Sequence, residues 1–165
     1  MNFPISVLPT TKLVGSSYSF IIMMAILIVV LFIYGITPTV YWLQLIYYIF
    51  CLYVFLFSFA LLSSTIAVLI RDYQMLLQST MRMLLYLSPI LWDPSDNRVP
   101  EWIENILQLN PFYYILTGIR DSFLSREWFF NDPIYFIYFW SITLVLLYFG
   151  SKVHLKFRKD FIDYL

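Results

Sequence analysis

Residues 41–70, which read YWLQLIYYIFCLYVFLFSFALLSSTIAVLI, decide the fold class of this chain. The stretch contains no charged side chain. A helix needs about 20 consecutive apolar residues to cross the hydrocarbon core of a bilayer, and this stretch is longer. Residues 41–70 therefore predict a transmembrane helix.

Three further apolar runs lie on either side of it, at about residues 16–35, 73–92 and 133–150. The first run is too long for the apolar part of a signal peptide, and no small-residue cleavage pattern follows it. Hydrophobic residues make up 61% of the 165-residue chain and charged residues only 12%, which is typical of a membrane protein. We expect an all-α integral membrane protein in which residues 1–165 form one transmembrane domain with four spans.

The cations indicate the orientation of these spans. Lys12 precedes the first span, Arg71 follows the second, and four lysines and arginines lie between residues 152 and 159. With four spans these regions share one side of the membrane. Segment 93–132, whose charged residues are mostly acidic, lies on the other side. The positive-inside rule then predicts cytoplasmic termini in the cell membrane, with residues 151–165 as a cytoplasmic tail.

The outer segment itself predicts a pair of short helices at about residues 100–124. Pro100 suits the first position of an amphipathic helix, which Asn110-Pro111 ends. Residues 112–124 are then apolar as far as Arg120-Asp121 but are too few to span. We expect this second helix to dip into the outer leaflet and return, covered by protein or by a water-filled path.

The third span carries a polar stripe, because Gln74, Gln78, Arg82 and Tyr86 recur every four residues. Such a stripe faces protein or water rather than lipid. Arg82 either lines a functional path within the membrane or anchors the helix by pairing or by reaching the headgroups.

The second span carries a weaker polar pattern. Gln44, Cys51, Ser58 and Thr65 recur every seven residues, and such small or weakly polar residues usually mark helix packing. Tyr48 and Phe55 fall on the same side. These aromatic side chains either pack or face lipid, or they form a surface on which sugar rings slide.

Motifs for catalysis are absent from the sequence. It contains no phosphate-binding glycine loop, no H-E-x-x-H and no G-x-S-x-G, so an enzyme is not expected. His154, the only histidine, lies in a basic tail and is expected to be solvated or to face headgroups. Asp93 and Asp96 fit a turn better than a metal site, and the single cysteine cannot form a disulfide framework. We expect no metal, no bound cofactor and no nucleic-acid partner.

Several short motifs follow one another along the chain, namely F3-P-I-S-V-L-P-T-T-K-L, L69-I-R-D-Y-Q, L87-S-P-I-L-W, V99-P-E-W, L109-N-P-F-Y-Y-I-L and I119-R-D. In this order they resemble the permease subunits of ABC-2 type exporters, in particular those that export teichoic acids and O-antigen-like polysaccharides.

This resemblance implies a permease of six spans that pairs with a second copy and with two cytoplasmic ATPase subunits. The ATPase would hold ATP and Mg, and a lipid-linked glycan such as teichoic acid would pass outward between the two halves. Residues 100–124 would match the paired outer gate helices, with Trp102, Ile106, Tyr113, Arg120 and Asp121 as gate residues. From face and chemistry, the predicted path residues are Gln44, Tyr48, Phe55, Gln78, Arg82 and Tyr86.

The chain departs from the family pattern at its start. Such permeases normally have an interface helix, two spans and a coupling helix before the F-P-I-S-V-L-P segment, so we expect an N-terminally truncated chain covering about the last three fifths of the pattern. Two alternatives stay open. One is an exporter of a drug or lipid with the same fold, and the other is a nonfunctional remnant or membrane scaffold.

Overall fold

The computed structural model describes residues 8–70, 72–88 and 106–157. Every regular element within these ranges is helical, which confirms the predicted all-α class. The elements are α1 (Leu8–Ile33), the short 3-10 helix η2 (Val40–Leu43), α2 (Gln44–Leu69), α3 (Tyr73–Leu87), α5 (Pro111–Leu124) and α6 (Pro133–Phe157).

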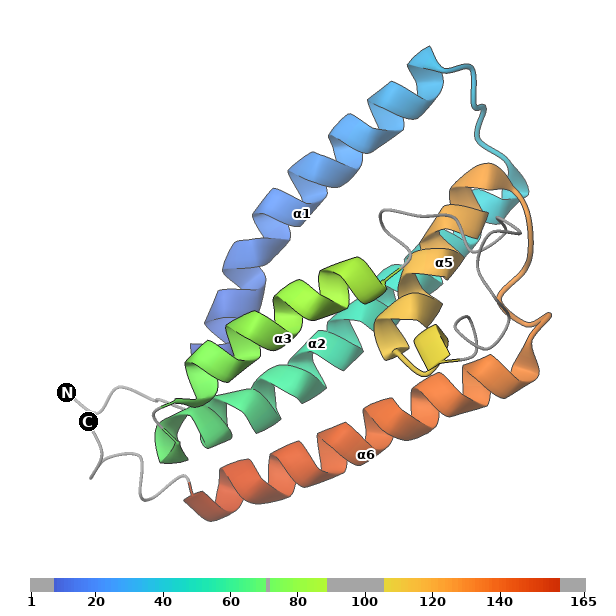
Figure 1. Cartoon of the computed structure of the whole chain (residues 1–165). Coiled ribbons are helices and arrows are strands. Elements are labelled where there is room, and N and C mark those ends of the chain that lie inside the picture. The colour runs from blue at the N-terminus through green and yellow to red at the C-terminus, as the bar shows by residue number, and fades with distance from the viewer. Residues whose placement is uncertain (1–7, 71, 89–105, 158–165) are drawn as a thin grey trace.

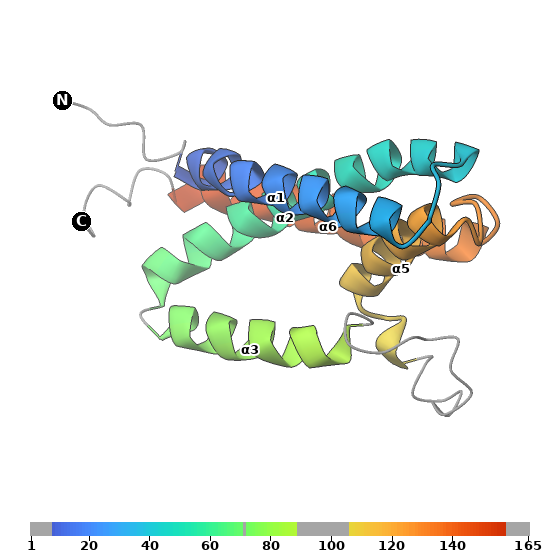
Figure 2. The same cartoon turned by 90° about the horizontal axis from the view of Figure 1, so that it is seen from above.

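Helix α2 is the centre of the fold and contacts α1, α3, α5 and α6. The start of α1, the end of α2 and the end of α6 lie at one end of the bundle, whereas α5 lies towards the opposite end (Figure 1). Figure 2 shows that α3 stands apart from the layer formed by α1, α2 and α6. This arrangement packs α5 mainly against α2 and η2, with a smaller contact to α6.

Three helices are long and apolar enough to cross a membrane, namely Leu13–Ile33, Val40–Val68 and Pro133–Lys156. They correspond to the first, second and fourth predicted spans. Helix α3 has 15 residues, which rise about 22 Å and fall short of a hydrocarbon core of about 30 Å. Residues 89–92 of the predicted span 73–92 lie outside the described residues, so this third span stays a prediction.

The helix bounds differ from the predicted ones at both ends of the chain. Helix α1 begins at Leu8, before the expected residue 16, and α6 continues to Phe157 instead of ending near residue 150. Residues 151–157 are therefore helical, and their place in a cytoplasmic tail stays a prediction. Basic side chains do not end a helix, and His154 and Lys156 in its last turn are favourable near the negative end of its dipole.

The α2–α6 interface is built on small side chains. An added Cβ at Gly150 would lie 3.2 Å from the Ser58 carbonyl oxygen and 3.2 Å from the Leu62 nitrogen, so the two backbones touch. The hydroxyls of Ser58 and Thr143 donate to carbonyls one turn earlier in their own helices. Close approach of this kind drives helix association in lipid, and it confirms that the seven-residue pattern on α2 marks packing.

His154 belongs to the same interface. Its side chain is buried, and its Nδ1 lies 3.3 Å from the hydroxyl oxygen of Thr65, which is also buried. The expectation of a solvated histidine was wrong, because α6 continues past residue 150 and turns this side chain towards α2. His154 therefore extends the helix contact to the end of the bundle near the termini.

Aromatic packing fills the space between α2, α5 and α6. Cys51 and Phe55 of α2, Ile115 of α5 and Phe139 of α6 form the buried core. The Phe55 and Phe139 ring centroids are 6.1 Å apart, and Phe139 stacks on Tyr114 at 4.8 Å. This core fixes α5 against the two long helices.

Candidate functional site

Helix α5 runs alongside α2 in the opposite direction. Its first turn lies beside the middle of α2, where the Phe112 and Phe55 rings meet edge to face at 5.1 Å. Its last turn lies beside the start of α2, where Phe123 meets Trp42 at 5.2 Å. With 14 residues α5 covers about 21 Å, so it occupies only part of the bundle's length. Its depth in a bilayer stays a prediction.

Side chains satisfy the backbone where α5 begins inside the bundle. The Asn110 side-chain oxygen accepts from the Phe112 amide at 3.0 Å, which caps the helix, and its amide group donates to the Ser88 hydroxyl at 3.2 Å. The Tyr138 hydroxyl of α6 donates to the Leu109 carbonyl at 2.7 Å. Irregular backbone at membrane depth needs cover of this kind from protein, or from a water-filled path.

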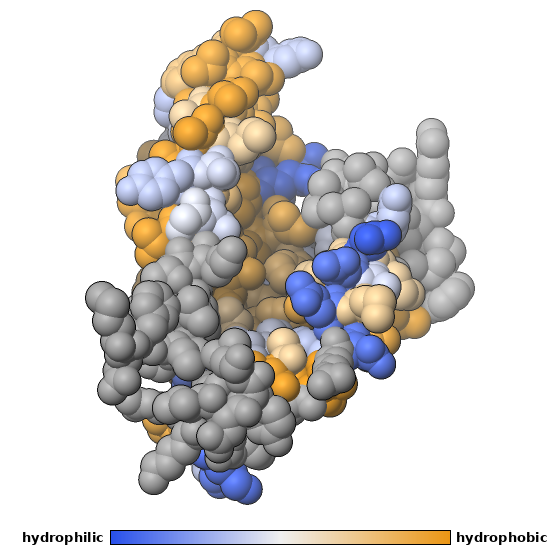
Figure 3. Space-filling view, turned by 90° about the vertical axis from the view of Figure 1, so that its left-hand side faces the viewer, coloured by the Kyte–Doolittle hydropathy of each residue, from blue (hydrophilic) through white to orange (hydrophobic). Residues whose placement is uncertain are grey.

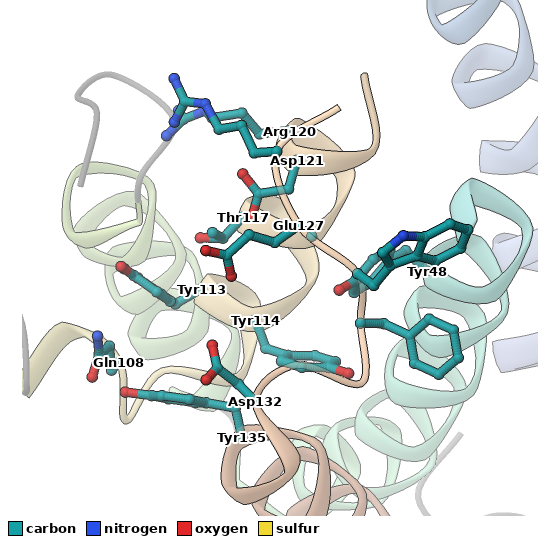
Figure 4. A pocket seen from close by; sticks show the side chains of 14 residues that line it. Tyr48, Gln108, Tyr113, Tyr114, Thr117, Arg120, Asp121, Glu127, Asp132 and Tyr135 are labelled. Carbon is teal, nitrogen blue, oxygen red and sulfur yellow. The ribbon is translucent and has the colours of Figure 1, made fainter. Parts of the chain in front are cut away.

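A cleft of about 360 Å³ opens beside the C-terminal half of α5. It is bounded by α5, by the connection 125–132 and by the first turn of α6, and we call it the α5–α6 cleft (Figure 4). Its lining combines charged or amide groups with aromatic rings and a few small groups. The lining residues are Gln108, Arg120, Asp121, Arg126, Glu127, Asp132, Tyr48, Tyr113, Tyr114, Trp128, Phe129, Tyr135, Thr117 and Gly118.

Polar groups lie on two sides of the α5–α6 cleft. Figure 4 shows Thr117, Asp121 and Glu127 along one side and Asp132 with Tyr135 along the other. Arg120 lies at the edge beside Asp121. Carboxylates accept hydrogen bonds and tyrosine hydroxyls both donate and accept, so the cleft can bind a ligand that presents several hydroxyl groups.

The connection 125–132 is held in place by Gln44 of α2. The Gln44 amide nitrogen donates to the Glu127 carbonyl at 2.8 Å, and its oxygen accepts from the Phe129 amide at 3.0 Å. Gln44 is 3% exposed, so both hydrogen bonds are shielded from water. One side chain thereby satisfies two backbone groups of a segment that forms no regular structure.

Aromatic rings of α2 and η2 support the same connection. Tyr41 packs on Trp128 with a centroid distance of 4.9 Å, and Tyr47 stacks on Phe129 at 4.5 Å. The Tyr47 hydroxyl accepts from the Trp140 indole at 3.1 Å and shares a hydrogen bond with the Tyr114 hydroxyl, also at 3.1 Å. These contacts fix the connection 125–132 to η2 and α2, and the Tyr47 hydroxyl links this part of α2 to α6.

Tyr48 reaches the cleft from α2 by passing the backbone of α5. A Cβ added at Gly118 would lie 1.9 Å from the Tyr48 ring carbon Cζ. No residue other than glycine leaves room for the ring in this position. Gly118 therefore determines that a side chain of α2 lines the cleft.

Four of the predicted site residues line the α5–α6 cleft, namely Tyr48, Tyr113, Arg120 and Asp121. Gln44 supports its wall, and Phe55 lies in the buried core. Ile106 is exposed and is not part of the lining. Trp102 lies outside the described residues.

The three predicted path residues of the third span are separate from the cleft. Gln78, Arg82 and Tyr86 are all exposed on α3. Figure 3 shows hydrophilic residues gathered on α3 across an apolar hollow from α1. The structure therefore divides the predicted site between the cleft and the α3 surface.

Sequence reasoning missed the part of the lining that the connection 125–132 supplies, which includes Glu127, Trp128, Phe129 and Asp132. A usable signal was present, because R126-E-W-F-F-N-D132 places three aromatic residues between carboxylates directly before a span. What the sequence could not indicate was that Gln44 folds this run back against α5.

Comparison with known proteins identifies the family. The model of the ABC-2 type transporter family matches residues 7–124. An O-antigen export system permease protein RfbA of Klebsiella pneumoniae is 27% identical over 157 residues, covering 94% of this chain and 60% of that protein. A permease of the same name from Myxococcus xanthus is 24% identical over 165 residues, covering 99% of this chain and 62% of that protein. The chain thus spans about three fifths of the length of these curated relatives.

The match covers most of the chain, and the chain therefore belongs to the ABC-2 type transporter family. Together with three helices of spanning length, this makes it a multi-pass membrane protein.

Proposed function

We propose that this chain is the membrane-spanning part of a polysaccharide exporter, a permease that moves a lipid-linked glycan across the plasma membrane. The observation that carries the proposal is the match of residues 7–124 to a family of transporters, with O-antigen export permeases among the relatives. The chain provides the helices, and a separate ATPase subunit binds ATP and Mg and drives the movement. A second permease copy completes the path.

The geometry supports a transport role at one end of the bundle. Helix α5 lies inside the bundle without covering its length, and it forms one wall of a polar and aromatic cleft. In the predicted orientation this end faces outward, and both termini lie in the cytoplasm. A wall of this kind, next to three long apolar helices, suits the exit of a cargo that is partly polar.

The proposal is tested in the organism that makes the protein. The gene is deleted and then restored with a tagged copy, and cell-surface polysaccharide and intracellular lipid-linked glycan are quantified. We expect deletion to lower surface polysaccharide and to raise the intracellular lipid-linked form, with recovery on restoration. An ATPase should copurify with the tagged protein from membranes.

The same experiment distinguishes the possible cargoes. Polymers rich in glycerol or ribitol phosphate are quantified separately from polymers without phosphate, which separates a teichoic acid from an O-antigen-like glycan. Unchanged surface polymers, with no ATPase in the purified sample, would contradict the proposal and favour a remnant or scaffold. An altered drug or lipid efflux with normal polysaccharide would favour another cargo.

A further inference from the structure

The charged side chains of the α5–α6 cleft favour an uncharged glycan over a polymer that carries phosphate groups. Three carboxylates, Asp121, Glu127 and Asp132, line it against two arginines, Arg120 and Arg126. The carboxylates outnumber the arginines, so the cleft disfavours a polymer with a phosphate on every unit. No group of three or more metal-binding side chains that could hold an ion occurs in the described ranges 8–70, 72–88 and 106–157.

The remaining chemistry of the cleft suits a sugar ring. A neutral sugar presents hydroxyl donors at its edge, which ionised carboxylates accept in short, strong hydrogen bonds. Tyrosine and tryptophan provide apolar ring surface together with a polar atom, which matches the mixed character of a sugar. The volume of about 360 Å³ lies within the range of about 300–1,000 Å³ for small-ligand sites.

One polar group among the lining residues of the cleft, the Thr117 hydroxyl, lacks a hydrogen bond within the described protein. The hydroxyl of Thr117 is buried and makes no hydrogen bond to any described part of the chain. Threonine in a helix ordinarily bonds to the carbonyl one turn earlier, as Thr65 and Thr143 do here. A buried hydroxyl without a partner is costly, and it would gain a hydrogen bond only if a side-chain rotation turned it towards a ligand in the cleft.

The wall is also preorganised. Gln44 fixes the backbone on both sides of Trp128, and the Tyr41 and Tyr47 rings hold Trp128 and Phe129 from the opposite side. Because these groups are positioned before a ligand arrives, less conformational entropy is lost on binding. The cleft is therefore a formed site and not merely a gap between helices.

From this geometry we infer that the α5–α6 cleft is a binding subsite for a neutral sugar residue, with Glu127 and Asp132 accepting its hydroxyls and Trp128 contacting its ring. The inference rests on the proposed function and narrows its cargo from glycans in general to glycans with uncharged sugar units. The side chains of Glu127 and Asp132 are exposed and point into the cleft, whereas only the Glu127 backbone takes part in the contact with Gln44.

The test measures sugar binding to the full chain in lipid nanodiscs by saturation-transfer NMR. The probes are mannotriose, which is neutral, and a glycerol phosphate oligomer of similar size, which is anionic. We expect transfer to mannotriose and little to the phosphate oligomer. The double variant Glu127→Gln and Asp132→Asn should weaken mannotriose binding by about tenfold, the loss that 1.4 kcal/mol produces.

Asp72→Asn is the matched control, because it removes an exposed carboxylate that is not part of the cleft. It should leave mannotriose binding unchanged. Circular dichroism checks that the variants keep their helices, and the single variants Glu127→Gln and Asp132→Asn replace the double variant if it does not fold.

Three results would overturn the inference: no transfer to either probe, stronger transfer to the phosphate oligomer, or equal mannotriose binding by the variants and the wild type. Each leaves the proposed function intact if deletion still abolishes surface polysaccharide. Conversely, sugar binding with normal surface polysaccharide after deletion would contradict the proposed function alone.

Discussion

The contact between Gly118 and Tyr48 shows how one residue determines what the cleft contains. Tyr48 belongs to α2, an apolar helix of spanning length, yet its ring lines a partly polar cleft because α5 has no side chain at position 118. The centroid of the Tyr48 ring also lies 5.6 Å from that of Tyr114, which itself stacks on Phe139 in the core. A larger residue at position 118 would close this passage.

Gly118→Ala should therefore force the Tyr48 ring out of its position. We expect a loss of about 1–3 kcal/mol in the free energy of unfolding, as for other overpacked cores, measured as a lower thermal midpoint in detergent. In a Tyr48→Ala background the same substitution should cost much less, because the clash is gone.

Gly15→Ala is the control for that measurement, because nothing lies within 4 Å of a Cβ added there. Equal effects of Gly118→Ala with and without Tyr48 would show that the ring does not pack against this glycine.

At the scale of the element, α5 depends on the turn that precedes it. The first amide groups of a helix lack partners within it, and here the Asn110 side chain accepts from one of them, that of Phe112, while Tyr138 donates to the Leu109 carbonyl in the preceding turn. Pro111 occupies the first helical position, where its missing amide hydrogen is not needed. Tyr138 thereby ties the turn before α5 to α6, and Asn110 caps the helix that follows.

Asn110→Ala and Tyr138→Phe should each loosen the start of α5. Loss of the cap costs about 0.5–2 kcal/mol, and loss of the Tyr138 hydroxyl leaves the Leu109 carbonyl without this donor at a cost of about 1–3 kcal/mol. Hydrogen exchange of the amides at residues 112–115 should become faster in both variants.

Tyr148→Phe is the control, because it removes an exposed hydroxyl from α6, the helix that carries Tyr138. It should leave hydrogen exchange at residues 112–115 unchanged. If Tyr138→Phe behaves like Tyr148→Phe, the hydroxyl does not hold the turn.

At the scale of the whole molecule, the described helices form two unequal parts. Helices α1, α5 and α6 pack around α2, while α3 stands apart (Figure 2). Its polar stripe is exposed, and so are Met75, Leu76 and Met83. Hydrogen bonds join it to other segments at its two ends, between Tyr73 and Ser63 and between the capping Ser88 and Asn110. An amphipathic helix with this exposure is expected to place its two faces in different surroundings.

Single-cysteine labelling in membranes tests this arrangement. With the buried Cys51 changed to alanine, Gln78→Cys and Arg82→Cys should react several-fold faster with a membrane-impermeant maleimide than Leu76→Cys and Met83→Cys. The reason is that the polar stripe faces water or a hydrated path, whereas the apolar face meets lipid or protein. Equal rates on both faces would exclude Gln78 and Arg82 from a hydrated path.

The fold could be predicted largely from the sequence. Residues 41–70 indicate a transmembrane helix because uncharged runs of this length have few other stable environments, and the spacing of Cys51, Ser58 and Thr65 indicates the packing face. The position of α5 after Asn110-Pro111 follows from capping chemistry. These features depend on neighbours in the chain and on the solvent preference of each side chain.

The α5–α6 cleft was decided only by the tertiary structure. Gln44 and Phe129 are distant in sequence, and nothing local indicates that the amide of one binds the backbone of the other. The same is true of Tyr48 beside Gly118 and of His154 beside Thr65. The sequence alone determined which segments are helical and apolar, because that depends on local periodicity. Which side chains meet was decided by how α2, α5 and α6 pack, because contacts between distant residues depend on the positions of all three helices at once.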